Sequence, residues 1–572
     1  MKKILLSSLL LLTIFILSSC EDITTSSDLP NDVSDVETPT VDDEDSTQII
    51  TTYDTSITIS ETSIVSSVSE AVSISDQVIT ISHEGTYELS GTSSNVSIYI
   101  NATSDETITL VFNGIDLSSN QGPIINVENA KKVIINLVEN TLNTLTDLST
   151  TAYDQNSVIY AKDDLTINGL GSLEINASYQ KGIKVNDNLV IVDATISIDS
   201  KDHGIKVNNT LILQDVNLTI LALGDGIKSE NDEDTSLSLV YIYGGTYNIT
   251  SYGDAISSSY DLTIEGGDFT IISGYNNTSS TESSKGLKAS NNLYLMDGTY
   301  DITSKDDALH ANQGLIIYDG TYDLASNDDG IHADVSIEIQ NGIINIEKSY
   351  EGIESSKIYI SGGQLSITSS DDGINGSSGT TTSLFQMDAS DGSIVQISGG
   401  LIYINAGGDG LDSNGDVIMS NGTVLIAGPT DNDNGAIDYN GSFKLTGGLL
   451  IAAGSSGMAE NVSQSSIVSV KIGLSTSTSS IFQLKDASGL VIATFAPGKT
   501  YNSIVIASQD LEVGTTYQLY IGGSITSYDE VYHGFYTNAL LSNQSLSLSF
   551  TISQTISTAG STSSINTGPT RP

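Results

Sequence analysis

The chain of 572 residues has one cysteine, Cys20, no tryptophan and 5 histidines. A disulfide framework needs several cysteines, and zinc or copper centres usually need clustered thiolates or imidazoles. These absences exclude a disulfide scaffold and a cysteine-based metal site. Any metal ion that this chain binds has to be held mainly by oxygen atoms.

Positive charge is also scarce. The chain has 20 Lys and Arg residues against 70 Asp and Glu residues, which gives a formal net charge of −50, and Arg571 is its only arginine. A nucleic-acid-binding protein needs a basic surface that displaces counterions from phosphates. Nucleic acid is therefore excluded as a partner, and an anionic polymer would be repelled unless bound cations reversed the local charge.

What the chain does have is a short repeat between residues 182 and 436. A small residue is followed by Ile or Leu and is most often preceded by an acidic residue, and six of the ten steps between these small residues are 21 or 22 positions long. A fixed period of this size indicates a solenoid, in which each repeat packs only against its neighbours. Copies include K-G-I-K (181–184), D-G-I-K (225–228), D-A-L-H (307–310), D-G-I-H (329–332) and D-G-L-D (409–412).

The residues within one repeat indicate strands. Residues 182–203 contain three short alternating apolar runs separated by Asn, Asp and Ser, without helical spacing. A second signal follows in several copies, as in G-T-Y-D-I (298–302) and G-T-Y-D-L (320–324). We therefore predict an all-β fold, a parallel β-helix with about 22 residues per coil.

This geometry places equivalent residues of successive coils about 4.8 Å apart. The acidic positions before the small residue would then form a column, and two carboxylates at about 5 Å repel by roughly 3 kcal/mol at an effective dielectric near 20. Calcium fits such a column best because it takes several oxygen ligands in a tolerant geometry. The alternative is a solvated turn, since tight turns also select Asp and Gly. The candidate Ca²⁺ ligands are Asp225, Asp254, Asp306, Asp307, Asp328, Asp329, Glu351, Asp371, Asp372 and Asp409.

A second column lies two positions after the small residue and changes from basic to acidic along the chain. It predicts either a long polar groove for an extended glycan or an exposed face on which lysine neutralises the acidic column. The candidate carbohydrate-binding residues in this column are Lys206, Lys228, Lys288, His310 and His332.

Aromatic residues form two groups. Tyr247, Phe269, Tyr300 and Tyr322 continue as aliphatic residues in later coils, which is typical of an interior stack. Tyr294, Tyr359 and Tyr403 each stand between two apolar residues, so we expect them to point outward and to offer platforms for sugar rings.

The N-terminal residues 1–20 combine a basic start, a short apolar run and Leu17-Ser18-Ser19-Cys20, the pattern of a bacterial lipoprotein signal peptide with lipid on Cys20. We expect an exported protein that is anchored to the bacterial cell surface through this lipid only. Residues 21–52 are acidic and rich in Ser and Thr, which predicts a disordered stalk.

The remaining boundaries follow from the period. We expect irregular coils at 53–160, regular coils at 161–460, a small antiparallel β unit at 461–552 that caps the open end, and a disordered tail at 553–572. The sequence does not indicate an oligomeric state.

Four segments have a recognisable sequence, P-I-I-N-V-E-N-A-K-K-V-I-I-N-L (123–137), D-D-G-I-H-A (328–333), G-S-S-G-M-A (454–459) and F-A-P-G-K-T-Y-N-S-I-V-I (495–506). They resemble a family of secreted bacterial β-helix proteins described as carbohydrate-binding domain-containing proteins. The resemblance spans roughly 80–525 and implies a right-handed parallel β-helix with bound calcium that adheres to cellulose and pectic acids rather than cleaving them.

Three functions compete. Calcium-dependent polysaccharide binding is favoured, a structural or adhesin-like surface protein without glycan specificity is the alternative, and a polysaccharide lyase or glycosidase is the third. Catalysis needs one distinct set of residues, whereas this chain repeats nearly equivalent carboxylates in coil after coil. An arginine base is absent from the repeats, and carboxylates beside Lys206 or Lys228 would raise rather than lower a lysine pKa. The expected protein is therefore not an enzyme.

Overall fold

The computed structural model describes residues 36, 38–68, 72–151, 153–279, 281–379 and 390–561. The chain divides into two units, Met1–Val36 and Glu37–Pro572. All of the described strands lie in the second unit. The predicted signal peptide with Cys20 and the end of the predicted tail lie outside the described residues. Within those residues the regular structure is almost entirely β-strand, with one 3₁₀ turn at Thr235–Leu237, and no helix is long and apolar enough to cross a membrane.

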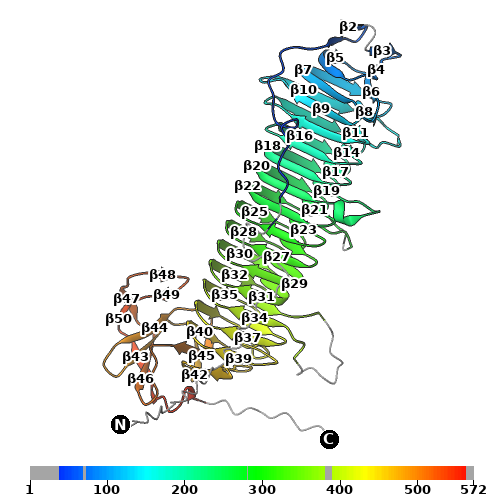
Figure 1. Cartoon of the computed structure of the whole chain (residues 1–572). Coiled ribbons are helices and arrows are strands. Elements are labelled where there is room, and N and C mark those ends of the chain that lie inside the picture. The colour runs from blue at the N-terminus through cyan, green and yellow to red at the C-terminus, as the bar shows by residue number, and fades with distance from the viewer. Residues whose placement is uncertain are drawn as a thin grey trace, which may run out of the picture. The chain divides into compact units, whose positions relative to one another are not determined.

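The strands stack in parallel, layer upon layer (Figure 1). Ile183 pairs with Ile205, which pairs with Ile227, so that hydrogen-bonded partners lie 22 positions apart. The same register recurs at Leu287, Leu309 and Ile331. The all-β class and a parallel, solenoid-like sheet are thus confirmed, and the handedness of the coils stays a prediction.

Each regular coil contributes strands to three faces. The first face follows directly after the small residue of the repeat. Its strands are β4 (Val78–Ile81), β6 (Ser97–Asn101), β8 (Ile125–Asn129), β11 (Ser157–Ala161), β14 (Lys181–Val185), β17 (Ile205–Val207), β19 (Ile227–Ser229), β21 (Ile256–Ser258), β23 (Leu287–Ala289), β26 (Leu309–Ala311), the first parts of β29 (Ile331–Ile339) and β31 (Ile353–Ile360), β33 (Ile374–Gly376) and β36 (Leu411–Ser413).

The second face begins with the N-terminal strands and includes the longest strands, which bend from the second to the third face. Its strands are β1 (Thr55–Ile59), β5 (Gly85–Ser93), β7 (Thr107–Ser119), β9 (Lys132–Leu137), β12 (Asp164–Asn168), β15 (Leu189–Val192), β18 (Leu211–Ala222), β20 (Val240–Ser251), β22 (Leu262–Ile272), β24 (Leu293–Leu295), β27 (Gly314–Ile317), the later parts of β29 and β31, β34 (Ile394–Ile397), β37 (Asp416–Met419), β39 (Phe443–Leu445) and β41 (Gln464–Ser465). At the N-terminal edge, β2 (Ile64–Ser66) pairs with β1 and β3 (Val72–Ser75) with β4, both antiparallel.

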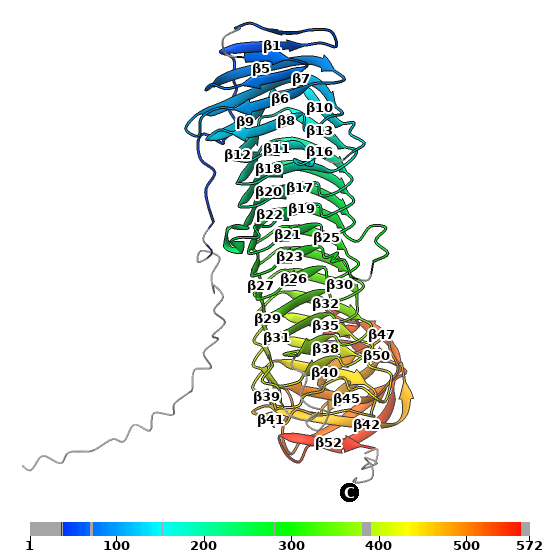
Figure 2. The same ribbon diagram turned by 90° about the vertical axis from the view of Figure 1, so that its right-hand side faces the viewer.

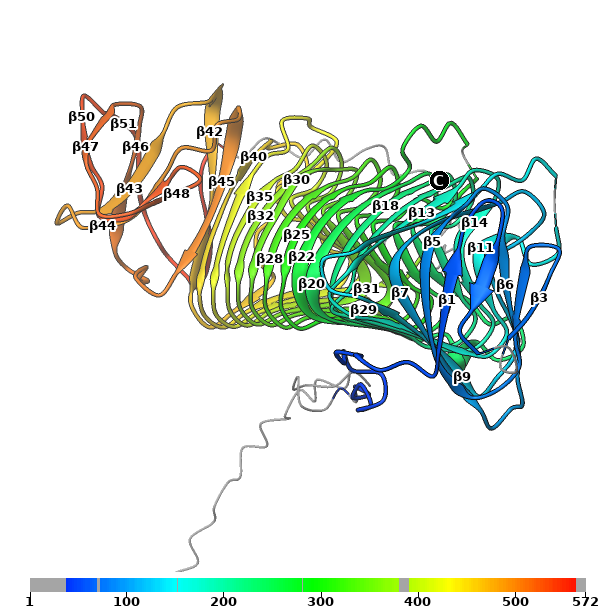
Figure 3. The ribbon, with the colours of Figure 1, turned by 90° about the horizontal axis from the view of Figure 1, so that it is seen from above.

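The third face carries the G-T-Y signals. It consists of the later parts of β7, β18, β20 and β22 together with β10 (Leu142–Asp147), β13 (Ser172–Ala177), β16 (Thr195–Ser200), β25 (Thr299–Thr303), β28 (Thr321–Ala325), β30 (Ile343–Ser349), β32 (Gln364–Ser369), β35 (Leu401–Asn405), β38 (Thr423–Ala427) and β40 (Leu449–Gly454). Figure 3 shows the coils following one another, with corresponding strands running side by side.

The core lies inside the coils and is built from Ile, Leu and Val with one aromatic column. Tyr247, Phe269, Tyr300 and Tyr322 stack with ring centroids 4.7, 4.9 and 4.6 Å apart, as the sequence predicts. Each of the three tyrosine hydroxyls donates to the carbonyl oxygen of the residue three positions earlier, so that these buried hydroxyls are all satisfied.

The small residue of the repeat is required by close backbone approach. A Cβ atom on Gly330 would lie 2.7 Å from the carbonyl oxygen of Gly352 in the next coil and 2.8 Å from the side chain of Ile346. Larger side chains would therefore separate neighbouring coils, which explains why only Gly and Ala occupy this column.

The segment 38–50 differs from the predicted disordered stalk. It lies along the outside of the second face (Figure 2), and we call it the strap. Asp45 in the strap is only 4% exposed, accepts hydrogen bonds from Lys132 Nζ at 2.8 Å and Thr166 Oγ1 at 2.5 Å, and binds two successive coils. Polar composition alone suggested disorder, but side chains on the solenoid surface supply partners for the strap.

The last coils are covered by the C-terminal residues. Strand β45 (Tyr501–Ser508) pairs antiparallel with β40 and with β42 (Val468–Thr478), and β52 (Ile556–Gly560) pairs with β42. Thus 556–560, which the sequence places in the loose tail, forms a strand. An antiparallel sheet follows, formed by β48 (Val531–Tyr532), β49 (Phe535–Tyr536), β44 (Val491–Phe495), β43 (Phe482–Asp486), β46 (Thr516–Ile521) and β51 (Ser545–Thr551), with a separate pair β47 (Ser524–Ser527) and β50 (Leu540–Ser542).

Candidate metal and glycan site

The acidic column has a structural role that sequence reasoning missed. In five coils, one oxygen of the aspartate accepts a hydrogen bond from the backbone N–H of the equivalent residue in the next coil, as Asp225, Asp254, Asp307, Asp329 and Asp372 do. The distances are 2.9 Å from Asp254 N to Asp225 Oδ1, 3.1 Å from Asp329 N to Asp307 Oδ1, and 2.6 Å from Asp409 N to Asp372 Oδ1. Aspartate therefore recurs at this position partly because it satisfies a backbone donor between coils.

Where histidine replaces aspartate in this column, the same bond persists. His203 Nδ1 accepts from the backbone N–H of Asp225 at 2.9 Å, which assigns the ring proton of neutral His203 to Nε2. Burial lowers the pKa of His203 to about 4, so this side chain is neutral at pH 7.

In the first half of the column, the second carboxylate oxygen is paired with a cationic side chain of the protein. Asp225 lies 3.4 Å from Lys228 Nζ, and Asp254 lies 3.2 Å from Lys288 Nζ. Lys285 reaches both Asp306 and Asp307, at 2.8 and 2.7 Å. These lysines occupy the place that the sequence assigned to metal ions.

Histidine takes over this role in the middle of the column. His310 Nδ1 lies 2.8 Å from Asp307 Oδ2, and His332 Nδ1 lies 2.9 Å from Asp329 Oδ2 and 3.3 Å from Glu354. Burial lowers the pKa of His332, but its hydrogen bond to Asp329 and the surrounding carboxylates raise it to about 9. His332 is therefore protonated at pH 7 and acts as a local countercharge.

The pattern changes after Glu354. The carboxylates of Asp372, Asp409 and Asp412 each offer an oxygen within 4.8 Å of the others, and we call these three residues the acid cluster. Among the described residues, no lysine, arginine or histidine forms an ion pair with them. Burial and mutual repulsion raise the pKa of Asp409 to about 7 and of Asp412 to about 8, and burial raises that of Asp372 to about 6.

An amide oxygen beside the acid cluster also lacks a donor. Asn375 is 8% exposed and pairs in register with Asp412 on the next coil. Its Nδ2 donates to Glu351 Oε2 at 2.8 Å, whereas its buried Oδ1 accepts no hydrogen bond within the described chain. A buried acceptor without a donor is costly, and a cation is one group that would satisfy it.

The acid cluster fits calcium better than zinc or copper. Its three carboxylate oxygens lie within 4.8 Å of one another, and two oxygens on opposite sides of a Ca²⁺ ion are about 4.8 Å apart, so all three can reach one ion. The cluster offers oxygen atoms only, while zinc and copper favour nitrogen or sulfur ligands. Asp372, Asp409 and Asp412 would hold the ion, and Asn375 could add a neutral oxygen.

The ten sequence candidates for metal binding thus do not share one environment. Asp225, Asp254, Asp306, Asp307 and Asp329 are paired with lysine or histidine. Asp372 and Asp409 lie in the acid cluster, and Glu351 is connected to it through Asn375, with a pKa that burial and Glu354 raise to about 8. Asp328 groups with Asp306 and Asp307 near Lys285, and Asp371 belongs to none of the groups formed by described residues. Asp412, two positions after the small residue, was not among the candidates.

The basic glycan candidates are engaged in internal contacts. Lys206 pairs with Glu230 at 2.6 Å, and Lys228 and Lys288 pair with the acidic column. A pocket of about 500 Å³ remains between Lys228 and Lys288, with Ser257 between them and walls that include Glu230 and Glu282. The lysines here neutralise carboxylates, which was the alternative interpretation of this column.

The three tyrosine candidates do not form a common platform. Tyr294 is only 8% exposed, which contradicts the expectation that it projects into solvent, because neighbouring outer residues cover its ring. Tyr403 stacks on His533 with ring centroids 4.3 Å apart, and Tyr532 next to it donates to the Leu365 carbonyl at 2.8 Å. Residues of the C-terminal unit therefore contact Tyr403, which is half-buried, and Tyr359 is half-buried on the second face.

The chain is an all-β solenoid whose coils carry a long polar column. Proteins of this class have an elongated surface that suits extended ligands. A family model described as "Carbohydrate-binding domain-containing protein" matches residues 75–330 and 330–488, and the chain belongs to that family. A relative with the same description from Acetivibrio thermocellus is 38% identical over 200 residues, which cover 34% of this chain and 70% of the relative.

A similar solved structure is described as the polysaccharide lyase-like protein from C. thermocellum, gadolinium derivative. It is 29% identical in sequence and covers 38% of this chain and 90% of its own, with a TM-score of 0.37. Membership of the carbohydrate-binding family supports glycan binding in general and a polysaccharide partner.

Proposed function

We propose that this protein is a calcium-dependent polysaccharide-binding protein of the bacterial cell surface, folded as a right-handed parallel β-helix and anchored through lipid on Cys20. The acid cluster is the observation that carries the calcium part of the proposal. It combines three converging carboxylates with a buried amide oxygen that has no donor in the described chain. A bound cation would lower the repulsion in this part of the column and leave positive charge for an acidic glycan such as pectate.

Calcium titration of the purified protein tests the metal site. In Asp409→Asn the side chain keeps Oδ1, which accepts from the Gly435 N–H, but loses the negative charge. We expect Ca²⁺ affinity measured by calorimetry to fall at least tenfold. Asp301→Asn on an exposed position of β25 is the matched control and should bind Ca²⁺ as the parent does. Equal affinity in the parent and in Asp409→Asn would refute the site.

Pull-down on insoluble cellulose and on pectate tests the glycan part. On pectate, the expected result is retention in Ca²⁺ and release in EGTA, with Asp409→Asn released in both. Retention on pectate that ignores EGTA would support glycan binding but refute its calcium dependence. Absence of binding to any polysaccharide would favour an adhesin-like surface protein instead.

Binding rather than cleavage is proposed because nearly equivalent carboxylates recur from coil to coil, and in the first half of the column they are tied to backbone N–H groups and to lysine or histidine. Appearance of new reducing ends or of unsaturated product from pectate would overturn this.

Lipidation is tested by detergent phase partition, in which Cys20→Ser should move the protein from the detergent phase to the aqueous phase.

A further inference from the structure

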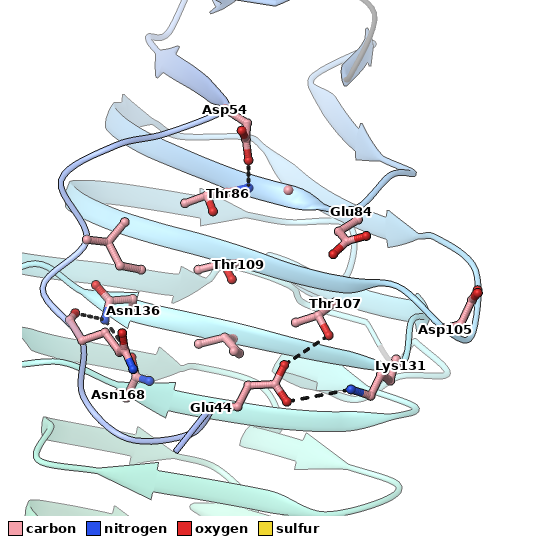
Figure 4. Close-up of a pocket in the computed structure, with 14 residues that line it drawn as sticks. Glu44, Asp54, Glu84, Thr86, Asp105, Thr107, Thr109, Lys131, Asn136 and Asn168 are labelled. Atoms are coloured by element: carbon pink, nitrogen blue, oxygen red, sulfur yellow. Dashed lines mark hydrogen bonds and ion pairs between the residues drawn. The ribbon is translucent and has the colours of Figure 1, made fainter. Parts of the chain in front are cut away.

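A second hollow lies far along the chain from the acid cluster, between the strap and the outer side of the second face. It measures about 860 Å³ and is lined by β5, β7 and β9 on one side and by Glu44, Gln48 and Ile50 of the strap on the other (Figure 4). We call it the strap cleft. The Ca²⁺ argument does not involve any of its residues.

The floor of the strap cleft is a row of outward side chains in register. Thr86 on β5 pairs with Thr109 on β7, which pairs with Ile134 on β9. Figure 4 shows the hydroxyl groups of Thr86 and Thr109 on this floor. Within the described chain, neither hydroxyl is used in a hydrogen bond to a protein group. The floor therefore offers two hydroxyl groups followed by one apolar side chain, on neighbouring strands about 4.8 Å apart.

The rim of the strap cleft is acidic. The carboxylates of Glu44, Asp54, Glu84 and Asp105 line it together with one lysine, Lys131. Glu44 lies 3.8 Å from Lys131 and 3.8 Å from Lys132, so three of the four carboxylates have no lysine partner in the described chain. Such a rim repels carboxylated sugars, while ionised carboxylates accept hydrogen bonds from sugar hydroxyls well. The lining thus favours an uncharged, hydroxyl-rich ligand, in contrast to the acidic glycan that calcium would attract.

The strap wall is held in place by the solenoid. Asn136 Nδ2 donates to the Gln48 carbonyl at 3.1 Å and to Asn168 Oδ1 at 2.8 Å, and Asn168 Nδ2 donates to the Asp45 carbonyl at 3.1 Å. These bonds fix one end of the cleft, while Asp54 fixes the other by accepting from the backbone N–H of Thr86 at 2.8 Å. Two fixed ends and an open middle make a preformed cleft.

We propose that the strap cleft is a second, calcium-independent binding site for a short uncharged oligosaccharide. The proposal rests on the proposed glycan-binding function only for the chemical class of its ligand. The carboxylates of the rim and the hydroxyls of Thr86 and Thr109 would bind sugar hydroxyls, and Ile50 and Ile134 would contact the C–H faces of the rings.

Calorimetric titration in EGTA tests the strap cleft alone, because EGTA removes the Ca²⁺ on which binding at the acid cluster would depend. The probes are cellotetraose and xylotetraose, which are uncharged, and tetragalacturonate, which is anionic. We expect one molecule of an uncharged tetrasaccharide to bind per chain and tetragalacturonate to bind at least tenfold more weakly. Absence of binding by both uncharged probes at millimolar concentration, or a preference for tetragalacturonate, would overturn the proposal.

Two variants locate the binding. Thr109→Tyr fills the floor and should weaken binding at least tenfold, whereas Thr270→Tyr, at an exposed position of β22, is the matched control and should not. Glu84→Ala removes an exposed rim carboxylate without touching the core and should weaken binding at least threefold. Unchanged affinity in both cleft variants would place the ligand elsewhere. The Ca²⁺ titration described above is independent of this outcome.

Discussion

At the scale of single residues, the acidic column combines two roles in one side chain. One oxygen accepts the backbone N–H of the next coil, and the other is left for a countercharge. Lys285 and His332 supply that charge in the middle coils. In the acid cluster, Asp372 and Asp409 keep the backbone bonds, but no cationic side chain lies among the described neighbours, so burial raises the pKa of the three carboxyl groups.

These raised pKa values predict how stability changes with pH. An unfolded Asp titrates near about 3.9, whereas Asp409 and Asp412 titrate near 7 and 8 in the folded chain. The folded state thus binds more protons between about pH 4 and pH 8, and its stability falls as pH rises through this window. In EGTA we expect the melting temperature to drop from pH 5 to pH 8.

With Ca²⁺ the trend should weaken or reverse, because the metal binds the ionised carboxylates and its affinity rises with pH. Melting curves with and without Ca²⁺ at each pH make the comparison, and Asp412→Asn should flatten the decline in EGTA. A melting temperature in EGTA that rises steadily from pH 5 to pH 8 would contradict the raised pKa values.

The glycine of the G-T-Y signal gives a second prediction at this scale. Gly320 has φ +116°, and a Cβ atom there would lie 2.9 Å from the Gly298 carbonyl oxygen and 3.0 Å from the Tyr322 ring. We expect Gly320→Ala to cost roughly 1–3 kcal/mol through backbone strain and the clash, measured as a lower melting temperature. Gly266→Ala is the control, since a Cβ atom at Gly266 meets nothing within 4 Å. Equal melting temperatures of the two variants would show that the close approach at Gly320 is unimportant.

At the scale of elements, the strap shows that an acidic, Ser- and Thr-rich segment can be ordered by polar partners alone. Asp45 is its main anchor and lies 2.8 Å from Lys132. The outer side of the second face carries Thr166, Asn136 and Asn168 toward the strap. Burying one carboxylate here is favourable only because each of its oxygens has a donor.

Asp45→Asn should therefore release the strap without unfolding the coils. We expect faster amide hydrogen exchange in peptides from 38–52, by at least tenfold, because the buried ion pair with Lys132 is lost. Asp43→Asn is the control, since Asp43 is exposed and contributes only its backbone carbonyl to described hydrogen bonds. Unchanged exchange in Asp45→Asn would mean that the strap is held by other contacts.

Spacing in the sequence predicts the pairing between successive coils but not the contacts between distant segments. The period, the inward aromatic stack and the parallel pairing followed from spacing, because register in a solenoid converts sequence offsets directly into neighbours. The ordered strap and β52 did not, because both are held by partners far away in the sequence. Spacing also did not predict which carboxylates pair with a cation, because pairing depends on how far each lysine or histidine side chain extends. Lys285, for example, contacts both Asp306 and Asp307.

At the scale of the whole chain, charge compensation is uneven along the column. The coils from Lys181 to His332 carry their own cations, and the coils from Glu351 to Asp438 carry carboxylates with raised pKa values. Because each coil contacts only its neighbours, a change at one coil is transmitted poorly to distant coils. A metal ion in the acid cluster should therefore act locally.

This locality gives the last prediction. Hydrogen exchange mapped over the whole chain with Ca²⁺ and with EGTA should show protection by Ca²⁺ in peptides from about 351–379 and 401–438, and no change in peptides from 181–332, where lysine and histidine already balance the column. The coils formed by residues 181–332 serve as the internal control within the same sample. Asp409→Asn should abolish the difference, because it removes charge from the acid cluster but keeps the backbone bond. A uniform change along all coils would instead mean that Ca²⁺ acts through the net charge of −50.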